Sequence, residues 1–254
     1  ACASWATGTR GANNPYPGIS IAQDGTATIF FRRCDCGQSA PTTYCQIVAD
    51  EAGLKYEDIK IEFKEYFSFD AFWPAGSMGA MVNSYGLVLN ARAMKKLILE
   101  YALKPMPVVG NYPGFGAPPV PSPFQGKTID DIDVKDSIIF EKANPSNTLP
   151  LKTLVSAYRY SWLQGGPFFV AISPPEPAKV DAMYDMARQA CFVEIEVDTE
   201  TGQVEVTKLV HSYDLGQSIN PNVNETQLFG GAYQGISVSA TEGIFYDPKT
   251  GVKL

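Results

Sequence analysis

Three segments of the sequence place glycine, serine or glutamine at the start of a predicted helix, where backbone and side chain can both bind a ligand. They are Gly37-Gln-Ser39, Gly76-Ser-Met-Gly79, and the stretch from Asn220 to Gln227. Backbone N–H groups at helix starts bind anions, and glycine lets a ligand approach the backbone closely. A glutamine amide both donates and accepts hydrogen bonds. The three segments could hold a ligand that is anionic at one end and a pterin-like heterocycle at the other, although purely structural helix starts share this composition.

The histidine and cysteine content gives little support for a metal ion bound by side chains. His211 is the one histidine, so a catalytic triad or a histidine-rich metal site cannot form within the chain, and we expect a structural role for it. The five cysteines include a Cys34-x-Cys36 pair and Cys45. Five is an odd number and too few for a disulfide scaffold in a chain of this size, so we expect reduced thiols. Zinc sites usually combine two cysteine or histidine pairs, so we expect no direct metal ligand.

Hydrophobic periodicity predicts the elements that position these residues. Alternating apolar residues predict strands at 19–22, 26–32, 59–63 and 137–140, and a hairpin at 192–197 and 204–211. Helical spacing predicts helices at 42–52, 87–103 and 151–158, and a further helix that begins near 224. Strict strand–helix alternation is absent, so we expect an α+β fold with mixed sheets and packed helices.

Composition limits the class of protein. The 254 residues suit one large domain or two modest ones, and 45% hydrophobic content excludes a disordered polyelectrolyte. The net charge of −7 argues against a nucleic-acid partner or an anionic membrane surface. The longest uncharged stretch, 105–125, contains seven prolines and cannot be a membrane span. We expect a first subdomain at 1–104, a Pro-rich connection and linking segment at 105–150, and a second subdomain at 151–254, in a cytoplasmic protein.

Longer motifs surround the three junctions. In the first half they are Asp24-Gly-Thr-Ala-Thr, Asp35-Cys-Gly-Gln-Ser-x-x-Thr-x-x-x-Gln46 and Gly76-Ser-Met-Gly-Ala80. In the second half they are Glu194-Ile-Glu-Val-Asp-x-x-Thr-Gly202, Asp214-x-Gly-x-x-Ile-Asn-Pro221, Gln227-x-x-Gly-Gly-x-x-Gln-Gly235 and Thr241-Glu242. This ordered series resembles the second molybdenum-cofactor domain of the xanthine dehydrogenase and aldehyde oxidase family, over nearly the whole chain and most loosely between 105 and 177.

The resemblance implies roles for the junction residues. Gln38 and Gln227 would hydrogen-bond the molybdenum cofactor, with Gln38 beside the oxo ligand of the metal. The pterin and its phosphate or nucleotide tail would be held by residues of the first two junctions: Cys36, Gly37, Gln38, Ser39, Gly76, Ser77, Met78, Gly79 and Ala80. Met78 would line the substrate pocket near the metal, and Phe72 and Trp73 just before it suggest an aromatic pocket wall.

The sequence departs from the family pattern at several of these positions. Ser39 stands where the family has the second glycine of Gly-Gln-Gly, and Asp35 replaces a glutamate. Ala80 and Met81 replace the usual serine and arginine, which removes a hydroxyl group and a charge. These changes point to an unusual substrate.

The resemblance also implies an activity and partners. The family inserts water-derived oxygen into a C–H bond of an N-heterocycle or aldehyde, and electrons leave through [2Fe-2S] clusters, often to FAD, on partner domains or subunits. The chain begins with Ala1, and the catalytic glutamate of the family would follow Leu254. We therefore expect a split subunit or a piece of a larger one, working with the remaining molybdenum-subunit segments, an Fe–S subunit and an FAD subunit.

Other interpretations of the sequence stay open. The same cofactor supports reductive chemistry in the hydroxybenzoyl-CoA reductase branch. A subunit that lost the cofactor and only supports the complex would fit the unusual Ala80-Met81 pair. An unrelated α+β binding domain is the remaining alternative. The sequence does not name the substrate, the choice between molybdenum and tungsten, or the mononucleotide or dinucleotide form of the pterin.

Overall fold

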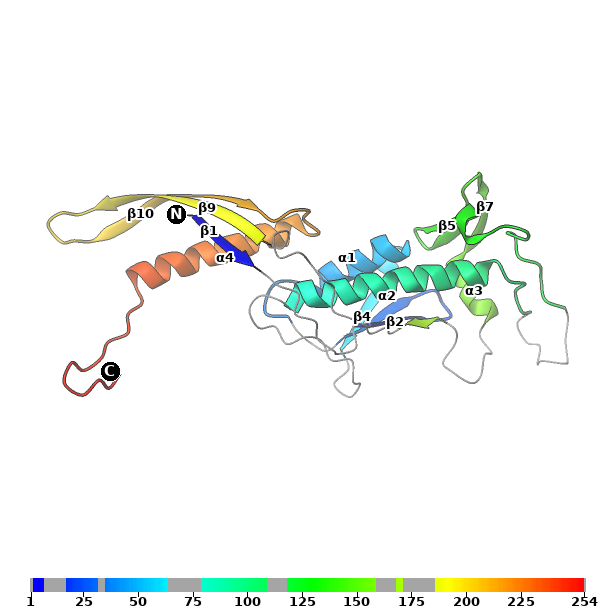
Figure 1. Cartoon of the computed structure of the whole chain (residues 1–254), viewed down its shortest axis with the longest axis horizontal. Helices are drawn as coiled ribbons and strands as arrows, with labels where there is room; N and C mark the ends of the chain where they lie inside the picture. Colours follow the sequence, from blue (N-terminus) through cyan, green and yellow to red (C-terminus); the bar gives the residue numbers. More distant parts are fainter. Residues whose placement is uncertain are drawn as a thin grey trace. The chain divides into compact units, whose positions relative to one another are not determined.

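The computed structural model describes residues 2–6, 17–31, 35–63, 79–108, 118–158, 168–170 and 186–253. The chain divides into a larger unit, Thr9–Lys179, and a smaller unit that combines Ala1–Gly8 with Val180–Leu254. Each unit contains both helix and sheet (Figure 1). The α+β class expected from the sequence is therefore confirmed.

The main sheet of the larger unit has four strands in the order β4-β3-β2-β8. β2 and β3 form an antiparallel hairpin, and Thr26 N–H donates to Asp24 Oδ1 at 2.9 Å in the turn between them. β4 pairs with β3 in parallel, and β8 pairs with β2 antiparallel. Three of the four strands confirm strands predicted from the sequence. Their bounds are β2 (Gly18–Ile21), β3 (Ala27–Phe31), β4 (Ile59–Phe63) and β8 (Phe169–Val170).

Three helices complete this unit: α1 (Ala40–Ala52), α2 (Gly79–Ala102) and α3 (Leu151–Ala157). α2 begins eight residues before the predicted start at Leu87 and continues through Gly86. The buried face continues into the added turns, because Asn83 and Gly86 are buried at helical spacing with Leu87 and Asn90. Among the described residues, every buried apolar side chain lies between Ile19 and Phe168, so the hydrophobic core belongs to this unit.

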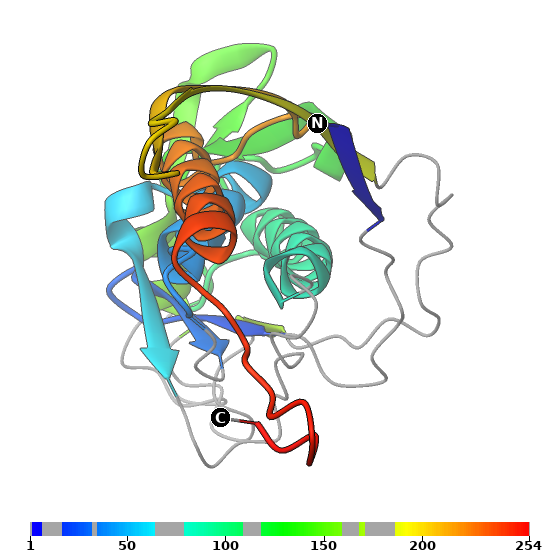
Figure 2. The same cartoon turned by 90° about the vertical axis from the view of Figure 1, so that its left-hand side faces the viewer.

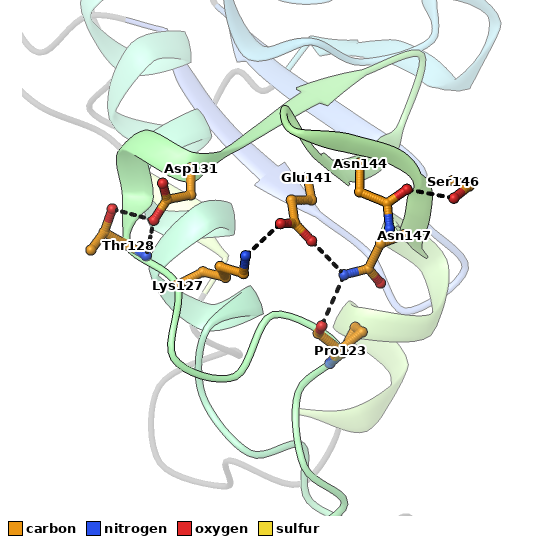
Figure 3. A network of polar contacts seen from close by, with 8 residues as sticks. All are labelled: Pro123, Lys127, Thr128, Asp131, Glu141, Asn144, Ser146 and Asn147. Atoms are coloured by element: carbon orange, nitrogen blue, oxygen red, sulfur yellow. Dashed lines mark hydrogen bonds and ion pairs between the residues drawn. The ribbon is translucent and has the colours of Figure 1, made fainter.

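A second, three-stranded sheet lies within residues 132–150, in the order β5-β6-β7. Its elements follow the 3-10 turn η2 (Ile129–Asp131), and η1 (Tyr56–Asp58) precedes β4. A polar network supports the sheet (Figure 3): Glu141, only 6% exposed, accepts from Lys127 Nζ at 2.5 Å and from Asn147 Nδ2 at 2.9 Å. The strands are β5 (Ile132–Lys135), β6 (Ile138–Glu141) and β7 (Asn144–Pro150).

The smaller unit is a three-stranded antiparallel sheet, ordered β1-β9-β10, with one helix. The hairpin turn is closed by Asp198, which accepts from the backbone N–H groups of Glu200 and Thr201. α4 lies along one face of the hairpin (Figures 1 and 2). In the described part of the chain no helix is long and apolar enough to cross a membrane. The elements are β1 (Cys2–Ala6), β9 (Met186–Val197), β10 (Val204–Asp214) and α4 (Pro221–Ala240).

Candidate functional site

The first candidate junction is a tight loop between β3 and α1, described from Asp35 onward. Gly37 has φ of +102° and Ser39 has φ of +53°, so the chain turns sharply twice in three residues. At Gly37 an added Cβ would meet no atom of the described residues within 4 Å, so in this part of the structure the backbone is open to a ligand on that side. The φ of Gly37 strongly favours glycine, because an L side chain rarely adopts it.

Gln38 is held in one orientation within this loop. Its side-chain oxygen Oε1 accepts from the backbone N–H of Cys36 at 2.7 Å. Because an N–H donor fixes which atom is the oxygen, the NH2 group forms the other end of the amide. Gln38 is half-buried. An amide NH2 group held in this way is the kind of donor that suits an oxo or phosphate oxygen.

The start of α1 adds an electropositive helix end. Ser39 is the N-cap residue, and its side chain makes no hydrogen bond to the N–H groups of the first turn. The Ser39 hydroxyl instead donates to Thr42 Oγ1 at 3.2 Å. Aligned peptide dipoles give a helix start a partial positive charge, so this end favours an anionic group.

α1 and α2 begin at the same edge of the main sheet. α1 connects the parallel strands β3 and β4, so it must run back against their direction. α2 runs in the same direction as α1. Its Asn90 Nδ2 donates to the carbonyl of Pro17, which is level with the end of β3. Further along α2, the Tyr101 ring lies 5.3 Å from the ring of Phe168, which is level with the start of β3. Both helices therefore start on the side of the main sheet at which β3 and β4 end, where α/β sheets commonly bind ligands.

Only part of the second junction is described. Gly79 and Ala80 are the first two residues of α2, and Ala80 is half-buried. The other candidates before α2 lie outside the described residues: Phe72, Trp73, Gly76, Ser77 and Met78.

The third junction lies in the smaller unit. Asn220 caps α4 by accepting from Val223 N–H at 3.3 Å, and Gln227 lies two turns into the helix with an exposed side chain. Gln227, Gly231 and Gly235 line a cavity of about 1010 Å³ between α4 and the β9–β10 hairpin. Gln38 and Gln227 thus belong to different units.

The histidine and cysteines have structural surroundings. His211 lies on β10, and its Nε2 is 2.9 Å from the Gln189 side-chain oxygen on β9. Cys45 is buried in α1, and burial raises the pKa of its thiol. Cys36 is exposed, and Cys34 lies outside the described residues. Within the described ranges no three His, Cys, Asp or Glu side chains gather closely enough to hold a metal ion.

Sequence reasoning missed two buried asparagines on α2, the helix that begins at the second junction. Asn83 is 1% exposed and Asn90 is 0% exposed, and both lie on the buried face of α2. Asn90 holds the carbonyl of Pro17 at 2.9 Å, just before β2. The signal was available, because asparagine recurs at helical spacing among the apolar residues of that face. A buried amide needs hydrogen-bond partners, so these positions indicate fixed loops next to the helix.

The donors of this edge fit a cofactor with an oxo group and an anionic tail: a fixed amide NH2 group, an open glycine and two helix starts. The molybdopterin cofactor-binding domain family matches residues 1–254. The chain belongs to this family.

Known relatives agree with this assignment and with the resemblance seen in the motifs. The chain is 24% identical over 250 residues to the xanthine dehydrogenase molybdenum-binding subunit of Escherichia coli O157:H7. The match covers 94% of this chain and 30% of the relative, so this chain spans less than a third of its length.

Solved structures share the fold. CO dehydrogenase from Oligotropha carboxidovorans aligns with a TM-score of 0.73 and 20% identity, over 100% of this chain and 30% of the other. Quinoline 2-oxidoreductase from Pseudomonas putida 86 aligns with a TM-score of 0.70 and 20% identity, over 94% and 28%. At these identities the likeness shows the fold of a molybdopterin-binding domain of this type.

Proposed function

We propose that the chain is the molybdopterin-binding part of a molybdenum hydroxylase, which inserts water-derived oxygen into a C–H bond of an N-heterocycle or aldehyde. The observation that carries the proposal is the fixed amide of Gln38 beside the start of α1, in a chain whose whole length matches the family. The bound cofactor supplies the redox chemistry. The protein supplies position and electrostatics.

The residues of this chain have distinct tasks in that proposal. The Gln38 NH2 group donates to an oxygen of the cofactor, and the open side of Gly37 lets the pterin approach the backbone. The starts of α1 and α2 balance the anionic tail. The full proposed set of cofactor contacts is Cys36, Gly37, Gln38, Ser39, Gly76, Ser77, Met78, Gly79, Ala80 and Gln227, and Met78, Phe72 and Trp73 form the proposed substrate pocket wall.

The proposal extends to the organisation of the enzyme. We propose that this chain works with the remaining molybdenum-subunit segments, and that electrons leave through [2Fe-2S] clusters and FAD on partners in the cytoplasm. The subdomain limits at 104 and 150 also remain proposals.

Elemental analysis of the natively purified complex, with mass spectrometry of the released pterin, tests the function. We expect one molybdenum or tungsten and one pterin per copy of this chain. Intact material with neither metal nor pterin would contradict the proposal and leave a supporting subunit. If metal and pterin are present, oxidation of N-heterocycles and aldehydes in ¹⁸O-labelled water separates the hydroxylase from a reductive enzyme, because only the hydroxylase incorporates the label.

A further inference from the structure

Asp35 opens the loop that carries Gln38. The backbone N–H of Gly37 donates to Asp35 Oδ1 at 3.0 Å, two residues along the chain. A short acidic or amide side chain that accepts from this N–H forms an Asx turn, which replaces a backbone turn by a side-chain one. Asp35 is exposed, so its carboxylate is not required for the hydrophobic core.

This turn and the orientation of Gln38 are coupled. The N–H of Cys36 and the N–H of Gly37 are neighbours on the chain: Gln38 Oε1 accepts the first at 2.7 Å and Asp35 Oδ1 accepts the second at 3.0 Å. The ring that this Asx turn closes contains the Asp35–Cys36 peptide, and the Cys36 N–H belongs to that peptide, so the turn aims the Cys36 N–H at Gln38. Loss of the turn frees this peptide to rotate. Gln38 Oε1 then loses the hydrogen bond from the Cys36 N–H that fixes the orientation of the amide.

We propose that Asp35 is a positioning residue that acts through Gln38: it sets the turn that presents the Gln38 NH2 group to the cofactor. The inference rests on the proposed function. The geometry requires a short side chain with an oxygen acceptor rather than a negative charge. Asparagine meets this requirement. Glutamate, which the related family carries here, is one methylene longer and cannot close the same ring.

The rate of pterin loss from the purified complex tests the proposal, measured by release into pterin-free buffer. We expect Asp35→Ala and Asp35→Glu to release pterin about twofold to tenfold faster than wild type, the range for one net hydrogen bond. Asp35→Asn keeps the turn and should stay within about twofold of wild type. Gln38→Ala sets the scale for full loss of the amide contact.

Asp24→Ala is the matched control. Asp24 makes the same kind of bond, from Thr26 N–H at 2.9 Å, in the β2–β3 turn of the same unit. If Asp24→Ala releases pterin at the wild-type rate, the loss of an Asx turn elsewhere in the unit does not by itself speed pterin release.

The outcomes separate the inference from the proposed function. If Gln38→Ala speeds release while Asp35→Ala and Asp35→Glu match wild type, the inference is overturned and the function stands. An Asp35→Asn variant as impaired as Asp35→Ala also overturns it, because charge would then matter. A wild-type complex that contains no pterin would contradict both the proposed function and the positioning role of Asp35. Asp35→Asn and Asp35→Glu keep a polar side chain, so their comparison decides the matter even where Asp35→Ala fails to assemble.

Discussion

At the scale of single residues, the amide of Gln38 is the group with the most defined chemistry. Its oxygen accepts from Cys36 N–H, so the chemistry offered to a ligand is donation. Gln38 is only half-buried, so if it contacts the cofactor as proposed, we expect a negative charge or a bare methyl at this position to affect cofactor binding more than the core.

We predict that Gln38→Glu lowers the molybdenum and pterin content of the purified complex by about tenfold or more, because a carboxylate next to an oxo group is an acceptor facing an acceptor. Elemental analysis and pterin quantification provide the measurement. Gln23→Glu makes the same change at an exposed turn residue of the same unit and should leave both contents unchanged. Equal contents in wild type and Gln38→Glu would remove Gln38 from the site.

The Glu141 network makes a second residue-scale prediction. Hydrogen bonds from Lys127 and then Asn147 lower the pKa of Glu141 in the folded chain. A carboxylate with a lowered folded pKa stabilises the fold above its unfolded pKa, and the contribution disappears as pH falls through the folded value. Glu141→Gln should therefore be less stable than wild type near pH 7, and the difference should shrink below about pH 4.

Urea unfolding between pH 3 and pH 7 measures this dependence. Glu57→Gln, at an exposed glutamate in η1, provides the comparison and should change the pH profile little. The prediction is wrong if Glu141→Gln and wild type differ in free energy of unfolding by the same amount at every pH in this range. Protonation of Glu141 would then not change its contribution to stability.

At the scale of elements, the end of α1 depends on one glycine. Gly53 has φ of +70°, and a Cβ there would lie 2.2 Å from the carbonyl oxygen of Val134 on β5. Gly53 also accepts from Ser137 N–H through its carbonyl oxygen, at 3.0 Å. The helix end and the second sheet are thus in direct backbone contact.

We predict that Gly53→Ala destabilises the chain by about 2–5 kcal/mol, from about 1–2 kcal/mol for the left-handed conformation and about 1–3 kcal/mol for overpacking. Gly126→Ala is the control, because Gly126 has φ of +79° but open space around its Cβ position. Gly126→Ala should lower the free energy of unfolding by only about 1–2 kcal/mol, which is what the left-handed conformation costs. Urea unfolding of the two variants compares them, and equal losses would mean that the contact with Val134 relaxes freely.

The sequence predicted these elements where local signals were strong. Gly53 marked the end of α1, and the Asp24-Gly25 turn marked the β2–β3 hairpin, since both depend on short-range backbone geometry. The first two turns of α2 were missed because Asn83 and Gly86 resemble a loop, and tertiary burial overrides that propensity. β7 was missed because it is polar and exposed along most of its length, and its pairing with β6 holds it in the sheet. β5 was missed although Ile132 and Val134 alternate with polar residues, because it is only four residues long.

The sequence could predict those features of the candidate site that depend on residues close together along the chain. Motif spacing identified Gln38, but the direction of its amide depends on two hydrogen bonds within the loop that no pattern encodes. The direction of α1 follows from the parallel pairing of β3 and β4, and that of α2 from its contacts with Pro17 and Phe168. Both are properties of tertiary structure.

At the scale of the whole molecule, burial is distributed unequally. The described core lies in the larger unit, whereas α4 has no buried residue and Phe229 and Tyr233 on it are 58% and 76% exposed. Local opening is easiest where few apolar side chains are buried. The smaller unit should therefore be the less protected of the two when the chain is studied without partners or cofactor.

Amide hydrogen exchange gives this prediction its test. In the isolated chain, we expect amides of α4 to exchange at least about tenfold faster than those of α2, because α2 carries the fully buried Leu87, Met94 and Ile98. In the purified complex, if Gln227 contacts the cofactor, α4 should gain protection when pterin is present over a pterin-depleted preparation, and α3, which carries no proposed contact, serves as the internal control. Protection of α4 equal to that of α2 in the isolated chain would contradict the burial argument. Equal protection of α4 in the pterin-containing and pterin-depleted complexes would instead contradict the contact through Gln227, because a bound ligand slows the opening of the helix that holds it.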